Sequence, residues 1–246
     1  MTSAAPAFYA RRGGRLADWW TVLHPPYTIW HLSYVVLGAA AAPRRDWGAL
    51  GLTLAAFLLG VGVAAHALDE LAGRPLRTAI PDTTLRWAAV VALAGAVGLG
   101  VYGVFWWAPV NWPALAAIPV GALLVVGYNL ELFGGRLHND LSFALGWGGF
   151  PALVGYLGQS PPYRLDLVPA AFAVLAAVGS SQGQRILSTP ARQLRRHTLE
   201  VEGRAVGQDG EVRDVDRGYL LAPLEGALRA MSWAVPAFAV AALLAR

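Results

Sequence analysis

Residues 66–78, with the sequence HALDELAGRPLRT, place one histidine, two carboxylates and two arginines directly after a long apolar run. His66 stands three and four positions before Asp69 and Glu70, so one helical face can present all three side chains. Carboxylate oxygens bind a hard cation such as Mg²⁺, and arginines such as Arg74 and Arg77 bind phosphate oxygens in a bidentate manner. The pattern therefore indicates either a site for a metal-bound phosphate or a set of ion pairs at a membrane surface.

The composition places these residues in a membrane protein. Hydrophobic residues make up 56% of the 246 residues, charged residues make up 14%, and the mean hydropathy is +0.47. A soluble domain does not carry that excess on its surface. All 19 basic residues are arginine and cysteine is absent, which excludes a retinal Schiff base, disulfides and thiolate catalysis. The arginines flank apolar runs, so no nucleic-acid partner is expected.

Seven apolar runs are long enough to cross a bilayer, which requires about 17 to 25 residues. The first 23 residues lack a compact apolar core, so we expect no cleavable signal peptide. The polar stretch 188–221 predicts a cytoplasmic loop that begins with a basic interfacial helix. We therefore predict an all-α polytopic transmembrane bundle of about seven spans, with residues 1–246 forming a single integral membrane domain. The runs cover residues 27–43, 47–68, 85–107, 113–133, 141–159, 165–187 and 222–245.

The arginines predict the orientation, because cytoplasmic segments near helix ends accumulate them. With the amino terminus inside, 14 arginines lie in inside segments, and Arg229 lies within the last run. The outside segments hold Arg44, Arg45, Arg164 and Arg246. We therefore expect a multi-pass protein of the cell membrane with a cytoplasmic amino terminus and an external carboxyl terminus.

Three polar clusters then lie at cytoplasmic ends of runs. The first two share a pattern, LDELAGRPL and LELFGGRL, which indicates a weak internal repeat of helical hairpins. Ionisable groups at membrane depth are expected to face a bundle interior, so we expect the clusters to line one cavity. The clusters contain His66, Asp69, Glu70, Arg74 and Arg77; Tyr128, Asn129, Glu131, Arg136, His138, Asn139 and Asp140; and Ser180, Ser181, Gln182, Gln184, Arg185 and Arg192.

The order of these motifs resembles the UbiA superfamily of intramembrane prenyltransferases. In that family the second helix ends in an N-D-x-x-D-x-x-x-D type motif followed by RPL or RPI, a tyrosine closes the fourth helix, and a D-x-x-x-D motif follows the sixth. GRPLRTAIP after the first cluster, and YNLELFGGRLHND followed by LSFALGWGGFPALVGY, carry the resemblance. It extends over about residues 25–195.

The sequence departs from the family pattern at both acidic motifs. His66 stands where the family has asparagine, and Asp69 and Glu70 are the carboxylates of the first motif. SSQGQRILSTPARQL, in the second position, contains no carboxylate. The chain has about seven apolar runs where the family usually has nine spans. Glu131 or Asp140 would then have to supplement a metal site.

The resemblance implies a membrane prenyltransferase in which Mg²⁺ helps the diphosphate of an isoprenoid substrate to leave and the prenyl group passes to a small-molecule acceptor, such as an aromatic quinone precursor. The catalytic residues expected are Asp69, Glu70, Tyr128 and Glu131, and the expected Mg²⁺ ligands are Asp69, Glu70, Glu131 and Asp140. The expected diphosphate ligands are His66, Arg74, Arg77, Arg136, Asn139, Gln182, Gln184, Arg185 and Arg192. The aromatic side chains placed to shelter a carbocation are Trp30, Tyr34, Tyr128, Trp147 and Tyr156.

Several alternatives stay open on the sequence. If no acceptor enters, the same site makes the protein a terpene cyclase, and the missing second acidic motif suits a non-catalytic lipid- or quinone-binding protein. A metal oxidoreductase would use His66, Glu70, Glu131 and His138. A transporter would use the repeated hairpins, although the polar groups cluster at one side. The sequence leaves open the prenyl chain length, the acceptor and the oligomeric state.

Overall fold

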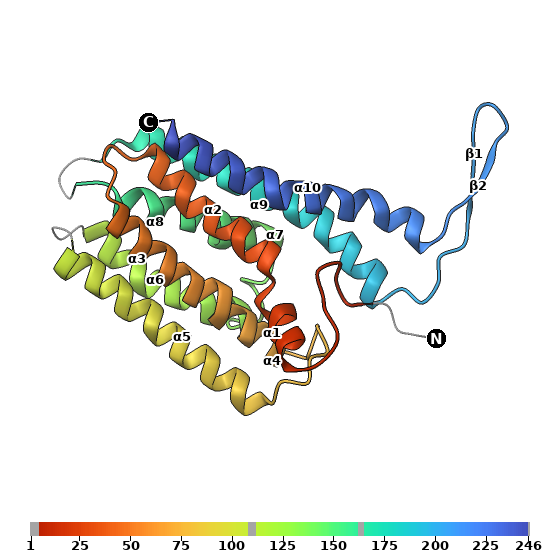
Figure 1. The fold of residues 1–246 in the computed structure, drawn as a ribbon, viewed down its shortest axis with the longest axis horizontal. Coiled ribbons are helices and arrows are strands. Elements are labelled where there is room, and N and C mark those ends of the chain that lie inside the picture. The colour runs from red at the N-terminus through yellow and green to blue at the C-terminus, as the bar shows by residue number, and fades with distance from the viewer. Residues whose placement is uncertain (1–4, 108–111, 162–164, 246) are drawn as a thin grey trace.

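Each of the seven apolar runs folds into a helical rod (Figure 1). The computed structural model describes residues 5–107, 112–161 and 165–245. Arg164 and Arg246, which enter the charge count above, lie outside the described residues. Three rods contain a π-helical segment, labelled η. The rods are α2 (Pro25–Ala41); α3 (Trp47–Phe57), η1 (Leu58–Ala65) and α4 (His66–Leu71); α5 (Asp82–Tyr102) and η2 (Gly103–Trp107); α6 (Trp112–Asn129); α7 (Asp140–Phe143), η3 (Ala144–Gly149) and α8 (Phe150–Gly158); α9 (Leu167–Arg196); and α10 (Arg217–Leu244).

Five of these rods, within the described ranges, are long and apolar enough to cross a membrane. They are the rods at Trp47–Leu71, Asp82–Trp107, Trp112–Asn129, Asp140–Gly158 and Arg217–Leu244. The other two are α2, which has 17 residues, and α9, whose second half is polar. The prediction of an all-α membrane bundle is confirmed, and the number of seven spans stays a prediction.

The polar stretch before the last rod differs from the expectation. Residues 188–196 continue α9 without a break instead of starting a separate interfacial helix. The loop that follows contains a hairpin of β1 (Arg204–Val206) and β2 (Val212–Asp214), which projects beyond the bundle (Figure 1). An additional short helix, α1 (Arg15–Leu23), precedes α2. Polarity alone does not end a helix, because arginine and glutamine are good helix formers.

Short polar side chains define where several rods begin. Asp46 accepts a hydrogen bond from the Ala49 N–H at the start of α3, and Asp216 accepts one from the Tyr219 N–H at the start of α10. Such caps satisfy backbone donors that a helix leaves free in its first turn. In a chain rich in Ala, Leu and Val, these residues set the helix starts.

The centre of the bundle is packed around α2, whose largest contacts are with α8 and α10. Close approach depends on glycine: a Cβ on Gly38 would lie 1.8 Å from the Ala152 carbonyl oxygen, and a Cβ on Gly155 would lie 2.1 Å from that of Val35. Small residues let helices approach in this way inside a membrane. The α2 and α8 backbones therefore lie in direct contact.

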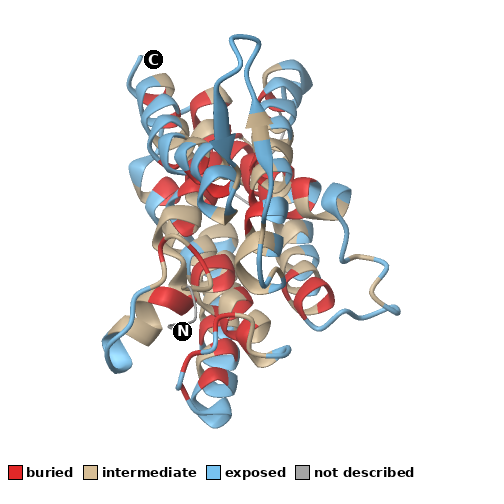
Figure 2. Cartoon of the chain, turned by 90° about the vertical axis from the view of Figure 1, so that its right-hand side faces the viewer, coloured by how far each residue is buried: buried red, intermediate tan, exposed pale blue. Residues whose placement is uncertain are grey.

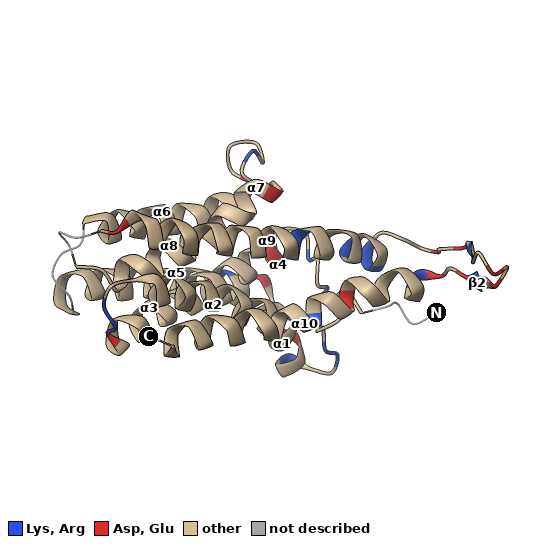
Figure 3. Cartoon of the chain, turned by 90° about the horizontal axis from the view of Figure 1, so that it is seen from above, with Lys and Arg blue, Asp and Glu red and all other residues tan. Residues whose placement is uncertain are grey.

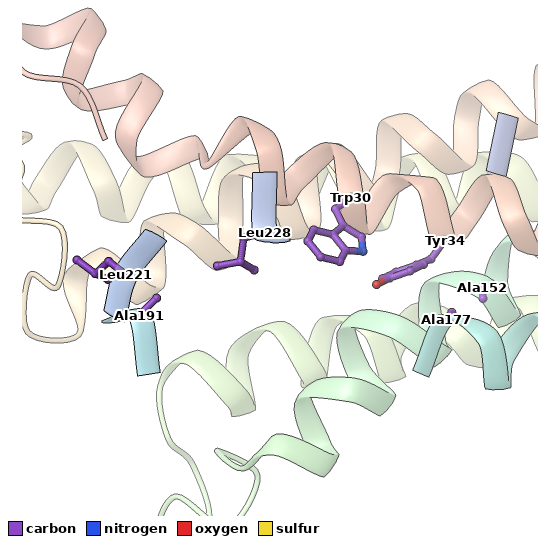
Figure 4. Close-up of a cluster of buried hydrophobic side chains, with 7 residues drawn as sticks. All are labelled: Trp30, Tyr34, Ala152, Ala177, Ala191, Leu221 and Leu228. Carbon is purple, nitrogen blue, oxygen red and sulfur yellow. The ribbon is translucent and has the colours of Figure 1, made fainter. Parts of the chain in front are cut away.

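Two of the buried clusters contain the aromatic residues that matter for the site. One lies between α2, α8, α9 and α10, and Figure 4 shows its residues, with the Trp30 and Tyr34 rings next to each other. The other lies between η1, α5, α6 and η3 and includes Tyr128 and Trp147. Figure 2 shows buried residues on inner helix faces and exposed residues outside. Exposed apolar side chains such as Trp87, which is 69% exposed, suit contact with lipid.

Candidate functional site

Glu70, at the end of α4, is fully buried and holds the loop that follows it. Its Oε2 accepts a hydrogen bond from the Leu76 N–H at 2.9 Å, and its Oε1 accepts from the Thr78 N–H at 2.9 Å and the Thr78 hydroxyl at 2.8 Å. Both carboxylate oxygens thus bind donors of the chain itself. In this geometry the Glu70 carboxylate is occupied by its own loop, so the catalytic and metal-binding roles expected of Glu70 stay a prediction that the hydrogen bonds do not favour.

Arg74 belongs to the same loop. Its Nη1 donates to the carbonyl oxygens of Ile80 at 2.6 Å and Thr78 at 3.3 Å, and its Nη2 pairs with Asp82 at the start of α5. Arg77 is exposed in a left-handed conformation, with φ of 56°, and makes no ion pair with the residues that the structure describes. Arg74 therefore holds the loop and the start of α5 together, and Arg77 lies on the surface. The diphosphate-binding roles expected of both stay a prediction.

The turn after α6 is also on the surface. Glu131 is exposed, and its Oε1 lies 3.8 Å from His138 Nδ1. Asn139 caps α7, since its Oδ1 accepts from the Ser142 N–H at 2.9 Å and its Nδ2 donates to the Arg136 carbonyl at 2.8 Å. The side chains of Glu131, Arg136 and Asn139 are exposed, so the fold does not bring these three predicted residues into the interior.

Other predicted residues do meet at the end of the bundle where α4, α6 and α9 finish, called here the polar end. Tyr128, from α6, interacts electrostatically with Asp69 of α4, with Asp140 of α7, and with Arg185 and Arg192 of α9. Figure 3 shows charged residues gathered toward this end, with a smaller set at the opposite end. The prediction that three sequence clusters converge is thus correct for part of each cluster.

Arg185 is the most strongly held of these groups. It is 12% exposed, its Nη2 lies 2.6 Å from Asp140 Oδ1, and its Nε donates to the same oxygen at 2.8 Å. The guanidinium carbon lies 5.0 Å from the centroid of the Phe143 ring, a cation–π contact. Asp140 therefore orients Arg185 and does not stand free as the predicted metal ligand.

Two further arginines follow on the same face of α9, at two and three helical turns from Arg185. Arg192 has as its described hydrogen-bond partner the Thr189 hydroxyl, at 3.5 Å, and within the described ranges no carboxylate pairs with it. Arg196, which the sequence did not single out, donates through Nε to the Pro6 carbonyl at 3.2 Å. Positive charge thus exceeds negative charge along this face, which favours an anion.

Buried polar atoms without partners lie among these arginines. Tyr128 Oη, Ser181 Oγ and Gln184 Oε1 are buried and make no hydrogen bond with the described residues. Such atoms are rare in folded proteins because each costs free energy comparable to a lost hydrogen bond. Gln184 and Ser181 lie on the inner face of α9, whereas Gln182 is half-buried. The unpaired atoms indicate room for a polar partner at this end.

An apolar cavity of about 170 Å³ adjoins the polar end. It lies between the rods of α3, α5, α6 and α8, and all three π-helical segments contribute to its wall. Trp147, from η3, lines the cavity and also packs on Tyr128, with ring centroids 4.4 Å apart. The Trp147 ring therefore lies between Tyr128 at the polar end and the cavity. The other aromatic residues named above lie elsewhere: Trp30 and Tyr34 bind Ser180, and Tyr156 donates to the Asp166 carbonyl.

The N-terminal segment Ala5–Gly14, called here the strap, covers the polar end. The Arg195 guanidinium donates to the Ala5 carbonyl at 3.2 Å, and the Trp20 indole donates to the Tyr9 carbonyl at 3.1 Å. The Tyr9 ring is 8% exposed and lies 4.7 Å from the His24 ring. Sequence reasoning did not predict the strap, because its contacts involve residues nearly 200 positions away.

His24 stands at the junction of α1 and α2 in a left-handed conformation, with φ of 47°. Its ring lies 4.4 Å from the His66 ring, and its Nε2 is a further buried atom without a described partner. A left-handed conformation is unusual for histidine and is maintained here by the surrounding structure. The sequence signal for this junction is a histidine directly before Pro25 and Pro26.

His24 predicts how stability depends on pH. Burial, and then the charge of His66, lowers the pKa of His24 well below its usual range. Below a pH of about 6.5 the unfolded chain binds a proton that the folded chain does not, so stability falls by up to about 1.4 kcal/mol per pH unit. The charged and titratable neighbours are Tyr9, Tyr27, His31, His66, Arg192 and Arg196.

The expected result is a thermal midpoint, measured in lipid nanodiscs, that drops more steeply with acidification in the parent chain than in His24→Gln. The exposed His197→Gln serves as the control and should follow the parent chain. Equal slopes for the parent chain and His24→Gln would show that His24 is not buried as the structure has it.

The donor set does not fit a metal ion held by several protein carboxylates. Within the described ranges there is no group of three or more His, Asp or Glu side chains that could hold one ion. Glu70 is closed off, Asp140 pairs with Arg185, and Glu131 lies at the surface. Half-buried Asp69 is the carboxylate left at the polar end. The oxidoreductase alternative, which needs Glu70, Glu131 and two histidines around one metal, has no support in this geometry.

Comparison with known proteins addresses the fold. No family model matches the chain, and no curated protein matches it significantly. The apo structure of a UbiA homolog from Aeropyrum pernix K1 is similar, with a TM-score of 0.52 and 18% sequence identity, over 87% of this chain and 76% of that one. The protein therefore has a UbiA-type membrane fold, as the sequence predicts.

Proposed function

We propose that the protein is a membrane prenyltransferase that acts on an isoprenoid diphosphate. The observation that carries the proposal is the arrangement at the polar end. A row of arginines on α9 stands beside buried polar atoms without a hydrogen-bond partner in the described part of the chain, and Trp147 lies between Tyr128 and an apolar cavity. These surroundings are first cationic, then polar and then apolar. A ligand with a polyanionic head and a long hydrocarbon tail matches them in that order. The UbiA-type fold supports the same class of substrate.

The diphosphate head would bind to Arg192 and Arg185, with the Tyr128 hydroxyl as a further donor. Arginine presents paired N–H groups that match phosphate oxygens. Arg192 lacks a carboxylate partner in the described chain, so its charge is available to an anion. Arg185 stays oriented by Asp140 while it donates through its remaining N–H groups.

The reaction would break the C1–O bond of the prenyl diphosphate, with the electron pair leaving on the diphosphate oxygen. Arginines aimed at that oxygen stabilise the charge that develops there. The allylic cation would be stabilised by the rings of Tyr128, Trp147 and Phe143, which pack together within 6.1 Å between centroids. An acceptor then supplies the electron pair of the new carbon bond and loses a proton.

We propose that magnesium enters as the counter-ion of the substrate diphosphate, with Asp69 as the carboxylate available to it. Mg²⁺ commonly binds through one or two carboxylates together with substrate phosphates. Every other step in the proposal relies on side chains of this chain.

The test is pyrophosphate release by purified protein in lipid nanodiscs. The substrates are geranyl, farnesyl and geranylgeranyl diphosphates, each assayed with Mg²⁺ and with EDTA, and with and without phenolic acceptors. We expect release with at least one substrate and a prenylated product when an acceptor is present. Release with a cyclic hydrocarbon product and no transfer would instead identify a terpene cyclase. Folded protein that releases no pyrophosphate from any substrate would contradict the proposal.

A second candidate is a non-catalytic protein that binds a prenylated lipid or quinone. The observation that favours it is the absence of a carboxylate group able to hold a metal within the described residues. Binding of prenyl diphosphates without release would support this candidate.

We also propose that the polar end faces the cytoplasm, because it carries most of the arginines, as the charge asymmetry predicts. The chain has no cysteine, so Gln208→Cys places a single thiol in the hairpin loop. In intact cells this thiol should resist an impermeant maleimide and react after permeabilisation. Labelling of intact cells would reverse the orientation.

A further inference from the structure

The apolar cavity is bounded lengthwise by two tryptophans. The rods that line it run between the polar end and the opposite end, so their residues can be ordered along its length. Val61, Val125 and Trp147 lie toward the polar end, and Ala49 and Trp107 lie at the other end. The tail of a ligand with its head at the polar end would therefore extend toward Trp107.

The Trp107 side chain is 47% exposed, and its indole is held by Asp46. Its N–H lies 3.2 Å from Asp46 Oδ2 and 3.3 Å from Oδ1. The ring lies directly over Gly48, where a Cβ would stand 1.9 Å from Trp107 Cζ2. A glycine is required at position 48 because the ring fills the space of a side chain.

Asp46, which holds the indole, is itself fixed at both backbone and side chain. Its Oδ1 accepts from the Ala49 N–H at 3.0 Å, its N–H donates to Gln159 Oε1 at 2.6 Å, and its carbonyl accepts from Gln159 Nε2 at 2.9 Å. The hydrogen bond from Ala49 lowers the pKa of the Asp46 carboxyl, which keeps the acceptor charged. Asp46, at the start of α3, thus holds Trp107 at the end of the cavity. Gln159, at the end of α8, in turn holds Asp46.

The length of the cavity limits the length of a prenyl tail that lies along it. Ala49 and Val61 are separated along the rod by at most about 18 Å at the helical rise per residue. An extended chain advances roughly 1.2 Å per main-chain bond, so that length accommodates about 15 bonds. An isoprenoid has about four main-chain bonds per unit, so an extended tail of about four units spans this length.

We propose that Trp107, held by Asp46 and Gly48, closes the end of the cavity and sets the longest prenyl tail that the protein accepts. The inference rests on the proposed function and adds the residue that selects the substrate by chain length. Tails of up to about 20 carbons should fit, and a 25-carbon tail should contact the indole. Truncation of Trp107 should then admit the longer tail.

The test compares Trp107→Ala with Trp106→Ala. Trp106 is the neighbouring indole, it is 71% exposed, and it packs on Tyr102 and Phe105 rather than on the cavity. For each variant kcat/KM is measured with the 15-carbon and 25-carbon diphosphates. We expect the ratio of the 25-carbon to the 15-carbon value to rise about tenfold or more in Trp107→Ala and to stay unchanged in Trp106→Ala. Trp107→Phe, which leaves a smaller ring, should give an intermediate ratio and serves if the alanine variant does not fold.

A second measurement does not depend on turnover. Prenyl alcohols of 10 to 25 carbons are added to each variant, and the shift of the thermal midpoint is recorded. The parent chain should be stabilised by alcohols up to about 20 carbons, and the limit should move to 25 in Trp107→Ala. If the longest stabilising alcohol changes in Trp107→Ala but no variant releases pyrophosphate, the role of Trp107 is supported and the proposed prenyl-transfer reaction is contradicted. An unmoved limit, or an unchanged kinetic ratio in both Trp107 variants, would overturn the inference.

Discussion

Replacing Arg192 by glutamine is expected to lower kcat/KM for pyrophosphate release by about 10²- to 10³-fold. Arg192 lies at the polar end with Arg185 and Tyr128, and in the described chain no carboxylate neutralises it. Its removal therefore takes away a charge that stabilises the departing diphosphate and leaves no acidic partner unpaired. The measurement is the initial rate against farnesyl diphosphate concentration in nanodiscs.

Two controls separate charge from structure. Arg204→Gln removes an exposed arginine from the hairpin and should leave kcat/KM unchanged. Arg192→Lys keeps the charge but loses paired donation, so it should retain part of the activity. The thermal midpoint of Arg192→Gln should stay close to that of the parent chain. Unchanged kcat/KM in a folded Arg192→Gln protein would show that the arginine row on α9 does not take part in the reaction.

Replacing Glu70 by glutamine is expected to destabilise the protein by about 2 to 3 kcal/mol. The Glu70 carboxylate accepts hydrogen bonds from two backbone N–H groups and the Thr78 hydroxyl inside the protein. An amide can accept at one end only, and its NH₂ group would face a backbone donor. The measurement is the midpoint of thermal or denaturant unfolding in nanodiscs.

Glu131→Gln is the matched control, because Glu131 is a carboxylate of the second cluster that is exposed. It should unfold like the parent chain. Glu70→Gln with parental stability but without pyrophosphate release would assign Glu70 to the chemistry and contradict the structural role argued above.

Helix content was predictable because it depends on long apolar runs, and each of the seven runs became a rod. The continuity of α9 was not, because the polar residues 188–196 indicated a separate interfacial helix, although Arg and Gln also favour continuation of the preceding helix. The hairpin was too short to leave a clear pattern. The three π-helical segments leave no periodic signal in the sequence, yet they line the cavity.

The sequence predicts which helix ends lie on the same side of the bundle. It does not predict which side chains at those ends point into the interior. Asp69, Tyr128, Arg185 and Arg192 meet because their helices end on one side. Glu70 follows Asp69 in the chain, but it turns into the loop that Thr78 closes. Adjacent residues on a helix point about 100° apart, and the sequence does not show which one faces the interior.

The strap and His24 were not predictable for a related reason. Their contacts join residues far apart in the chain, such as Arg196 with Pro6. No local pattern encodes such a contact, because it forms only when α9 and the N-terminal segment are both in place.

The most direct test of the central claim is an experimental structure in lipid with the non-hydrolysable analogue farnesyl thiodiphosphate bound. The account predicts the diphosphate group between Arg185, Arg192 and the Tyr128 hydroxyl, and the farnesyl tail past Trp147 in the apolar cavity toward Trp107. A diphosphate group on the surface loop at Arg77, or a tail between α2, α9 and α10, would contradict it.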